Sequence, residues 1–272
     1  MVHDLALRGH SGGPKWHLYG DRAGIEGVEI LDHLKGLYLP PKKLITTSAA
    51  TQVGSTPRKT VEDERVIEML VGTGGATQRD HDRVESAWWA SWSHFEVSRL
   101  EVDGAARWLD VRLLEYPDDP WTIHPDVNLW MEHDMRIVAC NPAWQAGTRA
   151  TDEVTGTGTM LIRGISNPTD RPMWLNFVGT PGLWWIQDGL TDRMVPIKEP
   201  LTQGWKLYTD PQARSLEVDD GTDVWPKIMR GLTFRSPIPP GTKDATITVY
   251  RQGSGTGVIR AEMVDQYSRP WG

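Results

Sequence analysis

The sequence predicts a mainly β protein of two domains, with one helix in the first domain and an antiparallel sandwich in the second. Three observations lead to this prediction: short alternating apolar segments between turn residues, a single segment with helical periodicity, and an uneven distribution of charge. Residues 1–140 carry 22 acidic and 15 basic residues, whereas residues 141–272 carry 14 of each. A Gly- and Thr-rich stretch at 147–158 follows this change, so we place the domain boundary between residues 140 and 141.

One segment of the first domain has helical periodicity, from about residue 80 to residue 95. Val84, Trp88, Trp92 and Phe95 recur at intervals of three and four residues, so they would form one apolar stripe along a helix. Asp80 lies at the start, where the helix dipole favours an acidic side chain. We therefore expect one helix among β-strands, and we place the strands at 16–19, 28–31, 65–71, 98–102, 107–114 and 129–140.

The second domain shows about eight short strand-like segments and no convincing helix. Turn-forming pairs such as Asn167-Pro168, Asp188-Gly189 and Asp210-Pro211 separate these segments. Strands at such near-regular spacing are typical of an antiparallel β-sandwich or jelly roll.

Composition argues against several classes of function. A net charge of −7 gives no sign of nucleic-acid binding. The apolar runs are too short for a transmembrane helix, and the first residues do not resemble a secretion signal. The single cysteine, Cys140, rules out an intrachain disulfide framework and a cysteine-based zinc site. Because Cys140 follows an apolar run, we expect it to be a core residue.

No arrangement of residues predicts catalysis or a metal or cofactor site. The eight histidines lack metal-ligand spacing, and Glu132-His133-Asp134 would alternate between the two faces of a strand. We find no Gly-x-Ser-x-Gly elbow between a strand and a helix. The acidic pairs Asp118-Asp119 and Asp219-Asp220 adjoin Pro or Gly, which marks turns rather than a catalytic pair. We therefore expect no catalytic residues, no metal and no cofactor.

Tryptophan is the most informative residue type, with 14 among 23 aromatic residues. Trp184 and Trp185 are adjacent, so in a strand they point to opposite faces, and one of them can be exposed. An exposed tryptophan either anchors a protein interface or stacks on a sugar, and we favour the interface. Trp184 and Trp185 are candidate glycan contacts. Trp89 leaves the apolar stripe of the helix and is a candidate interface residue.

Several motifs in this order resemble a known family. They lie at 35–41, 52–55, 167–172, 209–211 and 238–242, and the sequence ends Tyr267-Ser268-Arg269-Pro270-Trp271-Gly272. The chain resembles the minor tail proteins of siphovirus-type actinobacteriophages, within the distal tail protein family. This resemblance implies a structural virion protein without enzymatic activity. It implies an N-terminal domain that forms a ring, usually a hexamer, and a galectin-like C-terminal sandwich.

The resemblance also implies partners and a place in the virion. Copies of the chain would contact one another in the ring, and the ring would contact the tail tube protein and the tail-tip hub. The protein would be synthesised in the host cytoplasm and assembled into the tail tip of the virion. Neither specific nucleic-acid binding nor membrane insertion is expected, and the alternative function is a carbohydrate-binding module for host cell-wall glycan. We expect the long loop from Leu39 to Arg65 to reach a neighbouring subunit or the tube, with Thr47 and Gln52 at the interface. Trp89 and Trp271 complete the set of candidate interface residues.

Overall fold

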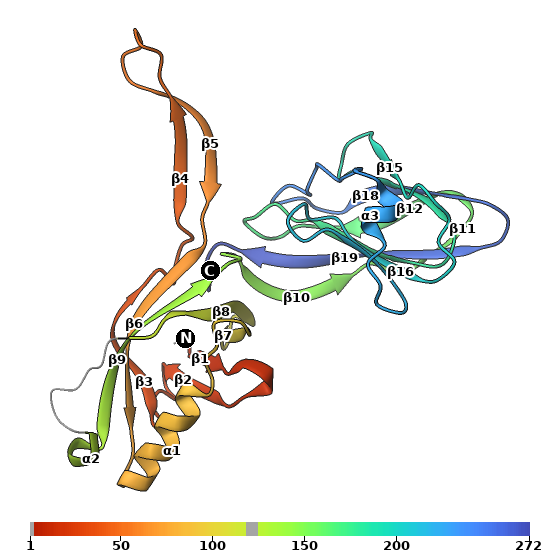
Figure 1. Cartoon of the computed structure of the whole chain (residues 1–272). Helices are drawn as coiled ribbons and strands as arrows, with labels where there is room; N and C mark the ends of the chain where they lie inside the picture. Colours follow the sequence, from red (N-terminus) through yellow and green to blue (C-terminus); the bar gives the residue numbers. More distant parts are fainter. Residues whose placement is uncertain (1–2, 118–124) are drawn as a thin grey trace. The chain divides into compact units, whose positions relative to one another are not determined.

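The computed structural model describes residues 3–117 and 125–272 (Figure 1). The chain forms two compact units, of which unit 1 comprises Met1–Gln145 and Ser268–Gly272, and unit 2 comprises Ala146–Tyr267. The sequence predicts a second domain that runs from residue 141 to residue 272, whereas the last five residues, the returning segment Ser268–Gly272, group with unit 1. Trp144 also lies in unit 1, since its ring is fully buried and its indole N–H donates to the carbonyl oxygen of Leu37 at 3.4 Å.

Unit 1 is built on an antiparallel sheet in the order β2-β1-β7-β8-β9-β6-β3. Its longest ladder joins β6 to β9 over ten residue pairs, from Arg65 opposite Ala139 to Gly74 opposite Trp130. The strands are β1 (Leu5–Arg8), β2 (Lys15–Tyr19), β3 (Val28–Lys35), β6 (Arg65–Gly74), β7 (Ser98–Val102), β8 (Arg107–Glu115) and β9 (Trp130–Ala139), with a 3-10 turn η1 (His10–Gly12) after β1.

The main helix, α1 (Gln78–Trp89), packs against β6 through Val84 and Trp88. Thr77 caps its start by accepting a hydrogen bond from the backbone N–H of Asp80 at 3.2 Å. The expected end at residue 95 is wrong: Trp92 is buried beyond the helix, and Phe95 is 88% exposed. The physical reason is local, because the Ser93 hydroxyl accepts the N–H groups of Phe95 and Glu96 and so favours a turn.

Unit 2 is a β-sandwich, as predicted. One sheet has the order β17-β16-β13-β19, with β10 and β11 also pairing with β19, and the second has the order β12-β18-β14-β15. Their inner faces enclose one apolar core that includes Phe177, Trp184 and Ile247. The strands are β10 (Trp144–Ala150), β11 (Val154–Gly156), β12 (Gly158–Ile165), β13 (Leu175–Gly179), β14 (Leu183–Gln187), β15 (Met194–Pro196), β16 (Trp205–Tyr208), β17 (Ser215–Val218), β18 (Ala245–Gln252) and β19 (Gly257–Tyr267).

Two short helices were not predicted, α2 (Pro125–Asn128) and α3 (Trp225–Met229). In α3, Pro226 occupies the first turn, and Trp225, Ile228 and Met229 are buried in the sandwich core. Helices of one turn contain too few residues to show a helical period, so their sequences carried no signal.

Residues 39–65 form a β-hairpin rather than the expected loop. Strands β4 (Lys42–Thr47) and β5 (Thr56–Glu62) pair only with each other, and Figure 1 shows them projecting beyond β6. We call residues 41–60 the arm. All twenty are exposed, so neither face has the alternating burial that makes a strand recognisable in a sequence.

Candidate assembly surfaces

The arm carries a uniform charge. Its four charged side chains, Lys42, Lys43, Arg58 and Lys59, are all basic, although the surrounding unit is acidic. Its apolar side chains are exposed as well, with Leu44 57% accessible. A two-stranded sheet with exposed apolar and cationic groups is marginally stable by itself and presents free edges for pairing. Among the described residues, the arm therefore presents an extended surface that pairs with no other strand.

The tip of the arm contains the two predicted residues Thr47 and Gln52. The Thr47 hydroxyl accepts a hydrogen bond from Nε of Arg58 at 2.9 Å. The Gln52 side chain donates to the hydroxyl of Thr56 at 2.8 Å and accepts from the backbone N–H of Ala49 at 3.3 Å. Both side chains are exposed and order the turn, so the tip has a defined shape that a partner can contact.

A buried arginine holds the root of the arm. The Arg65 side chain is fully buried, and its guanidinium donates to the carbonyl oxygens of Leu37 at 2.6 Å and Gly36 at 3.2 Å. It also donates to the carbonyl oxygen of Pro142 from Nη2 at 2.7 Å and from Nε at 3.0 Å. A fourth carbonyl, that of Ser268, accepts at 3.0 Å. One planar cation thus joins three segments that are distant in sequence.

Trp271 docks the returning segment onto unit 1. Its ring stacks on His3, with ring centroids 5.3 Å apart and an interplanar angle of 11°, and it lies 6.0 Å from the ring of Tyr38. Arg107 donates to the carbonyl oxygens of Arg269 at 3.0 Å and Gly272 at 2.9 Å. Trp271 remains half-buried, so it is available to a partner at one edge, and its place in an interface stays a prediction.

Trp89 belongs to a polar network between α1 and the sheet. Its indole N–H donates to Glu85 at 2.6 Å, and its ring packs edge-to-face on His133 with centroids 5.1 Å apart. Glu85 also accepts the Thr73 hydroxyl at 2.5 Å and lies 3.1 Å from Nε2 of His133. Burial raises the pKa of Glu85, but hydrogen bonds from His133, Thr73 and Trp89 outweigh it and leave the pKa below the usual value. Trp89 is half-buried, and its role at an interface is also untested.

An acidic face covers the outer side of β3, β6 and β9. Glu29 and Glu132 flank Gly72 across the sheet, and Asp32 and Asp134 flank Leu70 in the next row. We call these four carboxylates the acidic face. None of the four forms an ion pair with another described residue, whereas Glu68 in the following row contacts Lys35 and Arg136. Two of the four lie on β3 and two on β9, with β6 between them, so together they give this side of the sheet a negative surface that is available for contacts outside the subunit.

The two adjacent tryptophans of unit 2 separate as strand geometry requires. Trp184 is fully buried, and its indole N–H donates to the carbonyl oxygen of Thr180 at 3.0 Å. The prediction that Trp184 contacts a glycan is therefore wrong, because its ring has no accessible face. Trp185 points outward and lies edge-to-face on Tyr250, its cross-strand partner, with centroids 5.3 Å apart. Trp185 therefore stays a candidate glycan contact, together with Tyr250.

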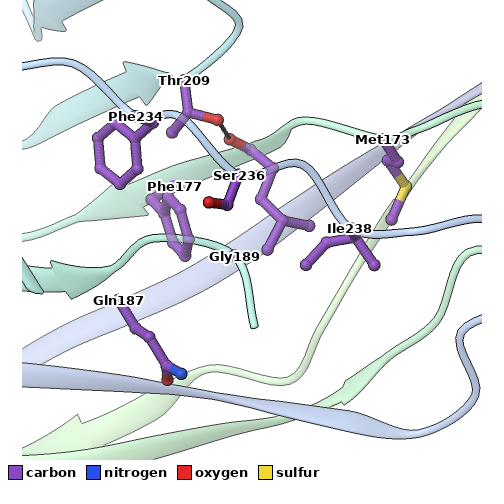
Figure 2. Close-up of a pocket in the computed structure, with 9 residues that line it drawn as sticks. Met173, Phe177, Gln187, Gly189, Thr209, Phe234, Ser236 and Ile238 are labelled. Atoms are coloured by element: carbon purple, nitrogen blue, oxygen red, sulfur yellow. Dashed lines mark hydrogen bonds between the residues drawn. The ribbon is translucent and has the colours of Figure 1, made fainter. Parts of the chain in front are cut away.

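A small cavity lies inside the sandwich (Figure 2). Its volume is about 10 Å³, enough for a single water molecule and too small for a sugar. Near it, the hydroxyl of Thr209 donates to the carbonyl oxygen of Leu175 at 2.6 Å. The buried carboxylate of Asp188 accepts the backbone N–H groups of Arg235 and Ser236 at 3.0 Å and contacts Arg193 at 2.5 Å. These polar groups are all engaged in holding loops to the sandwich. The lining residues are Met173, Leu175, Phe177, Gln187, Gly189, Thr209, Phe234, Ser236 and Ile238.

The residues considered as metal ligands or as a catalytic acidic pair do not form a site among the described residues. His133 points inward to Glu85, whereas Glu132 and Asp134 point outward, and the described residues contain no cluster of three potential metal ligands. Asp219 and Asp220 accept backbone N–H groups of Gly204 and Thr222 at 2.9 Å, as turn residues do. The pair Asp118-Asp119 lies outside the described residues.

Two further sequence interpretations need comment. Cys140 is exposed, so its expected place in the core is wrong, because β9 ends at Ala139 and the next residue leaves the sheet. Residues 9–13 read Gly-His-Ser-Gly-Gly after β1, and Ser11 has φ of 53°. The Ser11 hydroxyl donates to Glu96 at 2.7 Å and lies 3.5 Å from Nδ1 of His10. A 3-10 turn takes the place of the helix that a nucleophile elbow requires.

Comparison with known proteins identifies the kind of molecule. Two curated relatives are the minor tail proteins Gp27 of Mycobacterium phages L5 and D29, which are 21% and 23% identical. Each alignment covers 92% of this chain and 93% of the relative. No family model matches the sequence.

Solved structures show the fold. The Dit protein of phage SPP1, from the hub adsorption apparatus of phages that infect Gram-positive bacteria, aligns with a TM-score of 0.64 at 10% identity. This alignment covers 98% of the present chain and 99% of Dit. A chain of the phage P2 baseplate in its activated conformation aligns with a TM-score of 0.54 at 10% identity, over 96% of this chain and 98% of that one.

The similarity to minor tail proteins, together with the fold shared with Dit and a baseplate chain, identifies a hub-like structural protein of the phage tail tip. The chain is a homologue of the mycobacteriophage minor tail proteins Gp27, and it is a component of the virion. Within the described residues, no helix has the length and apolar character needed to cross a membrane.

Proposed function

We propose that this protein forms a ring, a homohexamer, at the tail tip, and that the ring links the tail tube to the tail-tip hub and the host-recognition apparatus. The observation that carries this proposal is the arm, an ordered hairpin of twenty exposed residues with no partner in its own subunit. A long exposed two-stranded sheet is costly in a monomer, since its edges and apolar groups remain uncovered. Packing in a ring covers both.

The proposed contacts use residues on three parts of unit 1. Thr47 and Gln52 bring the tip of the arm to a neighbouring subunit or to the tail tube protein. Trp271 and Trp89 offer half-exposed aromatic edges, which are favoured as interface anchors because they bury a large apolar area. The tail-tip hub proteins are the partners on the opposite side of the ring.

The acidic face fits the inner wall of such a ring. A tail channel transmits DNA, and uncompensated carboxylates facing the channel would repel phosphates and prevent adhesion of the DNA. Glu29, Asp32, Glu132 and Asp134 supply this negative charge from two strands of the same sheet. This assignment agrees with the expectation that the protein does not bind nucleic acid specifically.

The test is the mass and shape of the purified protein. Light scattering should give about six times the subunit mass of 30.6 kDa, and negative-stain images of the same fraction should show closed rings. A subunit that stays monomeric at all concentrations would contradict self-assembly into a ring. A closed ring with another number of subunits would correct the hexamer alone.

A second candidate function is supported by Trp185 and Tyr250. Their half-exposed pair on the outer face of the β12-β18-β14-β15 sheet offers an aromatic surface on which a host cell-wall sugar could stack. Titration with cell-wall oligosaccharide should quench tryptophan fluorescence in the wild type and not in a Trp185→Ala variant. An equal response in both would remove this candidate.

A further inference from the structure

The two faces of the arm differ in charge. Residues directly opposite in an antiparallel pair share a face, and neighbours along a strand alternate between faces. Lys43 pairs with Val61 and Ile45 pairs with Lys59, so these four side chains lie together. We call them the cationic face; three of them lie in the arm, and Val61 is the residue that follows it. It combines two uncompensated lysines with two β-branched apolar residues.

The opposite face is partly neutralised. Lys42 pairs with Glu62, and their charged atoms are 3.4 Å apart, whereas Leu44 pairs with Thr60. Arg58 belongs to neither face in this part of the arm. It is the extra residue at the bulge between Ile45 and Thr46, and its guanidinium donates to Thr47. Only the cationic face therefore presents positive charge and apolar surface without an intrasubunit partner among the described residues.

The rest of the same unit has the complementary charge. Of residues 1–140, the arm holds four basic residues and no acidic one, which leaves 22 acidic against 11 basic residues in the remainder. A second copy of this chain thus offers the basic arm an excess of acidic side chains. In a ring, each subunit uses one surface to contact the next and a different surface to receive the previous one, so complementary patches close the ring.

We propose that the cationic face, formed by Lys43, Ile45, Lys59 and Val61, docks on acidic side chains of unit 1 of a second copy of this chain, outside the acidic face that we assign to the channel wall. The inference rests on the proposed ring and adds the partner of the arm and the force that selects it. Opposite charges steer and align the two copies, and Ile45 and Val61 lose water in the contact. The association is therefore sensitive to salt, because exposed charges are screened at high ionic strength.

The experiment compares two variants of equal net charge. Lys43→Gln with Lys59→Gln removes the cationic face, and Lys42→Gln with Arg58→Gln removes the same charge from the other positions of the arm. Sedimentation velocity over a range of protein concentrations gives the midpoint concentration for ring formation. We expect the first variant to raise this midpoint about tenfold, which is the size of effect that about 1.4 kcal/mol produces, and the control to raise it about threefold or less.

A salt series completes the test. For the wild type, we expect the midpoint to rise about tenfold between 50 and 500 mM NaCl, and we expect a smaller rise for Lys43→Gln with Lys59→Gln. If rings form and both variants behave alike, or if salt has no effect, the cationic face has another partner and the inference is overturned while the ring remains. If the wild type forms no ring, the proposed function fails and this inference fails with it.

Discussion

The guanidinium of Arg65 donates a hydrogen bond to the carbonyl oxygen of Ser268, at 3.0 Å. Arg65 begins β6 at the root of the arm, and Ser268 begins the segment that returns from unit 2. The same guanidinium holds Leu37, which precedes the arm, and Pro142, which precedes the exit to unit 2. The arm, the exit and the return of the chain therefore share one buried cation.

Replacing Arg65 should destabilise unit 1. Arg65→Lys keeps the charge but offers a compact ammonium in place of the planar fork, so several buried carbonyl groups lose their donor. We expect the free energy of unfolding to fall by about 2–4 kcal/mol, measured by urea denaturation. Arg99→Lys is the control, since Arg99 lies in a partly exposed ion pair with Asp110 and should cost about 0.5 kcal/mol or less. Equal losses in both variants would show that the Arg65 hydrogen bonds contribute nothing particular.

Removing the Trp271 ring should release the returning segment. Trp271→Ala loses the stack on His3 and the contact with Tyr38, and we expect about 1–2 kcal/mol of lost stability in unit 1. Hydrogen exchange should become faster at residues 268–272 and 36–38. Trp185→Ala, in the sandwich, should leave these amides unchanged. Unaltered exchange in Trp271→Ala would mean that Arg107 and Arg65 hold the segment without the ring.

Glu85 should make stability depend on acidity. Its folded pKa lies below the unfolded value, so its contribution is present above the ordinary carboxyl pKa and is lost as pH falls through the folded value. Glu85→Gln should therefore cost about 1–3 kcal/mol at pH 7, and the difference from the wild type should shrink as pH falls below the ordinary carboxyl pKa. Urea unfolding at a series of pH values measures this. A difference that stays constant with pH would show that the Glu85 charge is not involved.

Shortening the arm should separate folding from assembly. Thr47 and Thr56 are directly opposite, so an Asn-Gly turn can replace residues 48–55 without disturbing β4 or β5. We expect the stability of the subunit to change by about 0.5 kcal/mol or less, because every deleted residue is exposed. Ring formation, followed by light scattering and negative-stain images, should be lost. Normal rings from the shortened protein would exclude the tip, with Gln52, from the interface.

The sequence alone determined those features that arise from local periodicity and turn chemistry. The stripe of Val84 and Trp88 indicated α1, and alternation between turn residues indicated the sandwich. Alternation also required Trp184 and Trp185 to face opposite ways. Which of them is buried depended on Ile186, which shares the inner face with Trp184, and on the second sheet that covers both.

Only the tertiary structure decided the features that depend on contacts between distant segments. The sequence of the arm does not show the alternation of apolar and polar residues that marks a strand with one buried face, because both faces of the arm are exposed. Arg65 looked like the first residue of a strand, and its role follows from carbonyl groups at positions 36, 37, 142 and 268 that only folding brings together. Local pattern specifies an element and its apolar face, whereas the partners of a polar side chain depend on the path of the whole chain.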